Sequence, residues 1–190
     1  EDGTKIPLYK DAMKRQYEPM LPGMFSLLKL TKTKGTDREL AEKLYELQYK
    51  YCNFILSRID AWKIDTMNAV DYAKEELSDM IDFSNGIGAT GHSLGGVTSY
   101  LLCIEKKEFA CGANLDGAAF GHKKDMILRK PFAQMSCKGN LSVETKVHLD
   151  HTEPVFQAVF NKMQHIAFSD MKHLIPSKMI VGGLDPDLAH

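Results

Sequence analysis

The stretch GIGATGHSLGGVTSYLL, residues 86–102, predicts a strand, a tight turn and a helix in direct succession. GIGAT is typical of a short buried strand, and the apolar residues after the turn recur at helical spacing. Between them, Ser93 is at the centre of a Gly-x-Ser-x-Gly pattern made with Gly91 and Gly95. Small residues at these two positions let the backbones of strand and helix pass closely, so we expect the serine on a strained turn. The pattern therefore predicts an exposed Ser93 hydroxyl at the end of the strand.

Three more predicted strands follow this turn, and other segments separate them. They are FACGANLD, PFAQMSC and PVFQAVFN, at residues 109–116, 131–137 and 154–161. Alternation of strands with helices predicts an α/β fold, with a mostly parallel sheet covered by helices on both faces.

A long amphipathic helix is predicted to begin after Thr36. Thr36 and Glu39 form a capping box, and apolar residues then recur every three or four positions as far as Ile59. A second helical pattern runs from Met67 to Met80. We expect residues 1–60 to form a helical cap or insertion, and residues 61–190 to form the sheet-bearing part of the same domain.

The composition is that of an ordinary globular domain. The 190 residues include 44% hydrophobic and 26% charged residues, with a net charge of -1, so the basic excess that favours nucleic-acid binding is missing. No apolar run approaches the length of about 18 residues that a membrane span needs. The four cysteines have no paired spacing and are interpreted as reduced core thiols, with a Cys103–Cys111 bridge as the alternative.

Chemistry at Ser93 requires partners, because a serine hydroxyl is a poor nucleophile near neutral pH. On a fold of this type a carboxylate and then a histidine follow the serine along the chain. Asp116 ends the strand after the turn, and His165 follows the last predicted strand. The alternatives are a turn-forming Asp116 and a surface-loop His165. The backbone N–H of Leu94, at the helix N-terminus, is expected to face an oxyanion on the attacked carbonyl.

Three further residues are candidates for a substrate pocket. His92 is adjacent to the serine, although its ring is expected to pack and not to catalyse. Met24 and Phe25 belong to the apolar segment 20–30, which could form part of a cap or meet a lipid surface. Such a segment is more often simply part of a core.

A metal site is not predicted. His148 and His151 flank Asp150 at a spacing that could suit a metal ion, but no further ligand cluster accompanies them in the sequence. We expect neither a metal nor a cofactor.

Four segments together resemble one known family. They are GHSLGGVTSYLL, FACGANLDGAAFG, PFAQMSC and HIAFSD, and they lie within roughly residues 45–175. In order and spacing they are similar to the α/β-hydrolase lipases and esterases of the platelet-activating-factor acetylhydrolase (isoform II) type. This resemblance implies an α/β-hydrolase fold in which Ser93 is the nucleophile, Asp116 the acid and His165 the base.

The resemblance also implies that the chain represents only the C-terminal part of the hydrolase domain. Members of the family carry, ahead of the matching region, several strands and a His-Gly motif that supplies the other oxyanion N–H. A segment carrying those elements is therefore an expected partner of the chain.

The expected activity is that of a serine carboxylic-ester hydrolase, which acts on a small-molecule ester or lipid through an acyl-enzyme. Two alternatives remain open at this point. One is a non-catalytic member of the fold that serves as a binding module, and the other is a peptidase or thioesterase that uses the same three residues.

Overall fold

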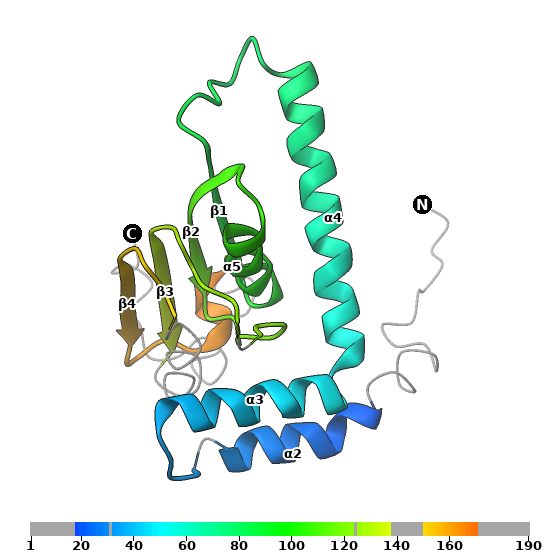
Figure 1. Ribbon diagram of the computed structural model, residues 1–190, viewed down its shortest axis with the longest axis vertical. Coiled ribbons are helices and arrows are strands. Elements are labelled where there is room, and N and C mark those ends of the chain that lie inside the picture. The colour runs from blue at the N-terminus through cyan, green and yellow to red at the C-terminus, as the bar shows by residue number, and fades with distance from the viewer. Residues whose placement is uncertain (1–17, 31, 124, 138–149, 171–190) are drawn as a thin grey trace.

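The computed structural model describes residues 18–30, 32–123, 125–137 and 150–170 and contains a four-stranded parallel sheet (Figure 1). The strands are β1 (Ile87–His92), β2 (Phe109–Leu115), β3 (Phe132–Cys137) and β4 (Val155–Phe160). They pair in the order β1-β2-β3-β4, and every pair is parallel. The predicted α/β class and parallel sheet are confirmed, and β1 is an edge strand of the described sheet.

Helix α5 (Leu94–Glu105) covers one face of this sheet and packs against β1 and β2. Its side chains make the largest single contribution to the core, which also includes Phe109 and Phe132 from the strands. A Cβ atom added at Gly91 or at Gly112 would contact α5, so these two positions face the helix. Because successive side chains of a strand point to opposite faces, the neighbouring Thr90 and Cys111 face the other side of the sheet. Both are exposed. Helical cover on both faces stays a prediction.

The four cysteines are free thiols, as interpreted from the sequence, but the interpretation as core residues is wrong for Cys111, which is exposed. Cys103 does not bond to the sulfur of Cys111; its thiol donates instead to the backbone carbonyl of that residue, at 3.4 Å. Burial raises the pKa of Cys103 to about 11, so this thiol stays protonated and packs as an apolar group.

The N-terminal helices differ from the sequence prediction in where they break. Helices α3 (Asp37–Tyr51) and α4 (Asn53–Glu76) meet at Cys52, whereas one helix was predicted as far as Ile59 and another from Met67 to Met80. The prediction was wrong because buried positions continue on both sides of Cys52, and neither glycine nor proline marks the change of direction. The capping box at Thr36 is confirmed. The expected boundary near residue 60 falls within α4.

Helix α3 lies near the end of the sheet at which the strands finish, and α2 (Leu21–Leu30) packs beside it (Figure 1). Leu40 and Leu44 of α3 pack against Ala119 in the segment that follows β2. The buried Gln48 side chain donates to the carbonyl of Ala119 at 3.0 Å and accepts from the N–H of Gly121 at 3.1 Å. This amide therefore fixes α3 to the segment directly after Asp116. None of the helices described, α4 included, combines the length and the apolar character that crossing a bilayer requires.

Candidate active site

The backbone of Ser93 is strained in the way that the sequence pattern predicts. Ser93 lies between β1 and α5 with φ 57° and ψ -122°, a region that non-glycine residues rarely occupy. Its N–H donates to the carbonyl of Leu115 at 2.9 Å, and its carbonyl accepts from the N–H groups of Gly96 and Val97. These bonds hold the turn against the end of β2 and compensate the strain.

The glycines around this turn have unequal roles. A Cβ atom at Gly91 would lie 2.3 Å from the backbone carbon of Gly95, so the need for a small residue at position 91 is confirmed. At Gly95 an added Cβ would meet nothing within 4 Å, so the expected need there is wrong for the described part of the chain. The confined position is Gly96, where a Cβ would lie 2.0 Å from Oδ1 of Asn114. The helix turns the Cβ direction of residue 96 toward the sheet and that of residue 95 away from it.

Alanine at these two helix positions is therefore expected to have opposite effects on stability. Gly96→Ala should lower the free energy of unfolding by about 1–3 kcal/mol, because the methyl group overpacks the contact with Asn114. Gly95→Ala should raise it by up to about 1 kcal/mol, because alanine loses less backbone entropy in a helix. Urea denaturation followed by circular dichroism measures both. Equal losses would mean that position 95 is as confined as position 96.

Asp116 follows β2 and holds its carboxylate in the protein interior, with a side chain that is 0% exposed. One carboxylate oxygen, Oδ1, accepts from the backbone N–H of Cys137 at 2.7 Å. The other, Oδ2, lies 2.7 Å from Nδ1 of His165. Both oxygens of this buried acid thus have hydrogen-bond partners, as a buried carboxylate requires.

The turn that carries Asp116 is shaped by Asn114, whose role the sequence did not reveal. The Asn114 side chain accepts from the N–H of Gly117 at 2.8 Å and donates to the carbonyl of the same residue at 2.9 Å. Asp116 itself has φ 56°, which makes it, with Ser93, one of two described non-glycine residues at positive φ. A Cβ at Gly117 would lie 2.2 Å from the carbonyl oxygen of Ser93. The acid turn and the serine turn therefore pack directly on each other.

His165 completes a continuous chain of hydrogen bonds to Ser93. It begins the short helix η2 (His165–Phe168), and its Nε2 lies 3.0 Å from Oγ of Ser93. An ionised carboxylate only accepts, so the bond to Asp116 places the proton on Nδ1 and leaves a lone pair on Nε2 for the serine hydroxyl. The His165 side chain is 42% exposed. The three predicted residues are thus brought together, with the imidazole at a solvent-accessible rim.

The backbone N–H of Leu94 lies at the N-terminus of α5. Leu94 is the first residue of α5, and its N–H makes no hydrogen bond to any residue that the structure describes. The partial positive charge of a helix N-terminus adds to the attraction for negative charge. This N–H is therefore suited to the predicted contact with an oxyanion.

His92 makes a contact that the sequence did not indicate. Its Nε2 lies 2.8 Å from the backbone carbonyl oxygen of His165. The two imidazole rings are 4.6 Å apart between centroids, and the ring of Phe168 lies 6.4 Å from that of His92. The sequence predicted only that the His92 ring packs beside a possible substrate pocket. The local pattern does not show which distant carbonyl group the ring contacts.

The other two candidate pocket residues are not joined to this group by any described interaction. Phe25 lies on α2 and is 67% exposed as a residue. The side chain of Met24 lies outside the described residues. The apolar residues around them differ in burial. Met20, just before α2, and Leu30, at its end, are buried, whereas Leu21 is exposed.

The two described histidines outside this group, His122 and His151, make structural contacts. His122 is buried, and its Nδ1 lies 3.0 Å from the hydroxyl of Tyr100. Burial lowers the pKa of His122 to about 4, so its ring is neutral near pH 7. Asp150 forms an ion pair with Arg38 at 2.9 Å, and His148 lies outside the described residues. Across the described ranges, no three His, Cys, Asp or Glu side chains gather as metal ligands would.

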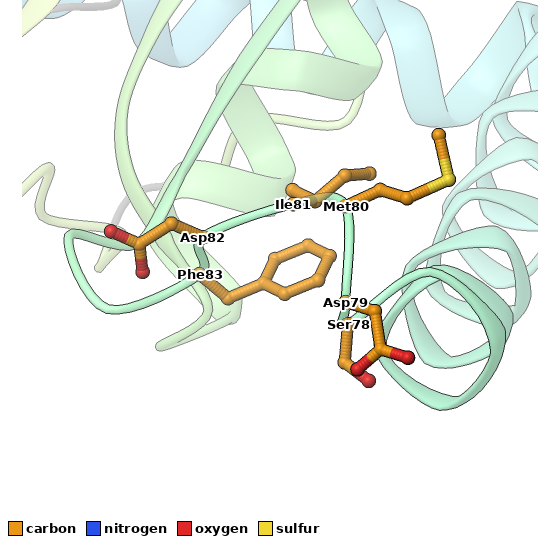
Figure 2. Close-up of a pocket in the computed structure, with 6 residues that line it drawn as sticks. All are labelled: Ser78, Asp79, Met80, Ile81, Asp82 and Phe83. Carbon is orange, nitrogen blue, oxygen red and sulfur yellow. The ribbon is translucent and has the colours of Figure 1, made fainter.

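A separate pocket of about 480 Å³ lies on the connection between α4 and β1 (Figure 2). Its lining is Ser78, Asp79, Met80, Ile81, Asp82 and Phe83. The carboxylates of Asp79 and Asp82 point to different sides of this connection, and no histidine lines it. It lacks the hydrogen-bonded serine and histidine that are found around Ser93.

No protein-family model matches this chain, and no curated protein matches it.

Proposed function

We propose that this protein is a serine hydrolase that cleaves carboxylic esters through an acyl-enzyme. One observation carries the proposal: a single run of hydrogen bonds links Ser93 Oγ to His165 Nε2 at 3.0 Å and His165 Nδ1 to Asp116 Oδ2 at 2.7 Å. A hydroxyl, an imidazole and a buried carboxylate in this order are what nucleophilic attack by serine requires. The strained turn at Ser93 and the resemblance of four segments to hydrolases support the same conclusion.

The reaction proceeds in two halves. His165 Nε2 takes the Ser93 hydroxyl proton as Oγ attacks the ester carbonyl, and the imidazolium then gives this proton to the leaving alkoxide. Water attacks the resulting acyl-enzyme with His165 again as base, which releases the carboxylic acid and restores Ser93. Asp116 remains ionised throughout, because its role is to hold the imidazole tautomer and to stabilise the imidazolium. The Leu94 N–H stabilises the oxyanion of each tetrahedral intermediate.

The edge strand β1 supports a proposal about a second oxyanion donor. β1 carries the nucleophile and pairs with β2 on one side only in the described sheet. In the hydrolases that the chain resembles, further strands continue the sheet beyond this position and one of their loops supplies another N–H. We propose that such a segment pairs with β1 in the active protein, because losing one oxyanion donor costs about a hundredfold or more in rate.

Covalent labelling with a fluorophosphonate tests the proposal. The reagent should phosphonylate Ser93 and release fluoride, because only an activated serine attacks phosphorus at a useful rate. Peptide mass spectrometry should locate the adduct on the peptide that contains Ser93, and the Ser93→Ala variant should stay unlabelled.

Two outcomes would contradict the proposal. Absence of an adduct on a folded protein favours a non-catalytic binding module on the same scaffold. An adduct on another serine would move the nucleophile elsewhere. For a labelled protein, rates on matched ester, thioester and amide substrates then assign the class of bond that is cleaved.

A further inference from the structure

We propose that His92 is a positioning residue that holds the base, His165, in register with Ser93 and Asp116 through a hydrogen bond to the backbone carbonyl of His165. This inference rests on the proposed function, because it concerns how precisely the His165 imidazole is positioned relative to Ser93 and Asp116. It assigns His92 to the alignment of the base and not to a substrate pocket.

The direction of the hydrogen bond follows from its chemistry. A backbone carbonyl can only accept, so Nε2 of His92 must carry a proton and donate it to the His165 oxygen, 2.8 Å away. The donor is on the last residue of β1, and the acceptor is 73 residues later, on the first residue of η2. The bond therefore fixes the turn that bears the base to the strand that leads into the nucleophile.

The need for such a link comes from the way His165 is held. Ser93 and Asp116 are attached to strand ends, whereas His165 begins a helix of four residues and has a 42% exposed side chain. A rotation of its main chain would move Nδ1 and Nε2 together, and a misplacement of about 1 Å at a reacting group can cost a hundredfold in rate. Holding the carbonyl of His165 limits this rotation directly.

Aromatic contacts on the same side of the site strengthen the link. The rings of His92 and His165 lie 4.6 Å apart at an interplanar angle of 38°, and Phe168 stacks on His92 at 6.4 Å. Phe168 in turn meets Phe160, the last residue of β4, edge to face at 5.5 Å. The turn is thus held between the two outer strands of the described sheet. His92 contributes both a ring and a donor, and these two contributions can be separated by mutation.

Two substitutions separate the ring from the donor. His92→Phe keeps an aromatic ring but removes the N–H. His92→Gln removes the ring but can place an amide N–H near the position of Nε2. His151→Phe is the matched control, because His151 also bonds a backbone carbonyl, that of Glu153 at 3.1 Å, on an exposed segment.

The assay is hydrolysis of a soluble short-chain p-nitrophenyl ester by each variant of the full chain. We expect H92F to lower kcat by about 10- to 100-fold with KM within about twofold, because the base is misplaced while substrate binding is kept. H92Q should recover most of the lost kcat, and H151F should match the unmodified protein. A raised KM with unchanged kcat would overturn the inference and place His92 in the substrate pocket. Equal losses in H92F and H92Q would overturn it too, because the ring and not the donor would then matter.

A second readout does not depend on turnover. The Nδ1 proton of His165, held by Asp116, gives a low-field proton NMR signal when it is ordered. This signal should broaden or disappear in H92F and persist in H92Q and H151F. A sharp signal in H92F would overturn the inference whether or not the protein hydrolyses esters. Failure of labelling and turnover in the unmodified protein, with the signal still dependent on His92, would reject the proposed function alone.

Discussion

Replacing Ser93 with alanine is expected to lower kcat for a soluble short-chain ester by about a millionfold, to the level left by binding and oxyanion contacts alone. The loss is this large because no other oxygen lies at hydrogen-bonding distance from Nε2 of His165 among the described side chains. Release of p-nitrophenolate, followed by absorbance, measures the rate. The free energy of unfolding should not fall, because alanine removes only a hydroxyl.

Ser99→Ala provides the matched control for this experiment. Ser99 lies on α5, two turns from the nucleophile, and its hydroxyl donates to the carbonyl of Gly95 at 2.9 Å. It takes no part in the hydrogen bonds from Ser93 to Asp116. Ser99→Ala should keep the unmodified rate, and a Ser93→Ala protein that hydrolyses esters at near-normal rates would refute the assignment of the nucleophile.

The second large effect is expected from Asp116→Asn, which should lower kcat by about 10⁴-fold with little change in structure. The asparagine oxygen can still accept from the N–H of Cys137, which leaves the amide N–H₂ group facing Nδ1 of His165. Nδ1 must then accept, so the proton moves to Nε2. An Nε2 that carries a proton cannot take the proton of Ser93. The Asp116→Asn variant therefore keeps the arrangement of the three side chains but holds His165 in the tautomer that carries its proton on Nε2.

The same ester assay, with a near-ultraviolet circular dichroism spectrum, measures this result. Asp79→Asn, on the connection shown in Figure 2, makes the same chemical change away from the site and should keep the full rate. If kcat of the Asp116→Asn variant were within tenfold of that of the unmodified protein, the carboxylate would not control the tautomer of His165. A loss of folded structure would instead assign Asp116 a role in stability.

Much of the candidate site could be predicted because its parts are local. Gly91 and Ser93 mark a turn whose backbone is strained whatever lies around it, and Asp116 is placed by the end of the strand that carries it. In a parallel sheet the ends of successive strands meet at one edge, so the positions of Asp116 and His165 follow from chain order. The geometry that joins these residues agrees with that expectation.

The parts that could not be predicted depend on contacts between distant segments. Gly96, and not Gly95, is confined because Asn114 lies against it, and this neighbour belongs to another strand. The bond from His92 to His165 likewise spans 73 residues. The break between α3 and α4 at Cys52 has no local sequence signal, because apolar residues at helical spacing fit one straight helix as well as two. Periodicity indicates that a helix exists but not where its axis changes direction.

Ser93 and Asp116 are the two described non-glycine residues at positive φ, and their turns pack directly on each other. The Ser93 hydroxyl and the Asp116 carboxylate are therefore positioned by folding itself, and neither needs to move for the proposed reaction. The imidazole alone is borne by a short surface turn, so thermal loosening would disturb it first, while the sheet beneath was still intact. For the proposed hydrolysis, we therefore expect heat tolerance to depend on the anchoring of His165 more than on the stability of the core.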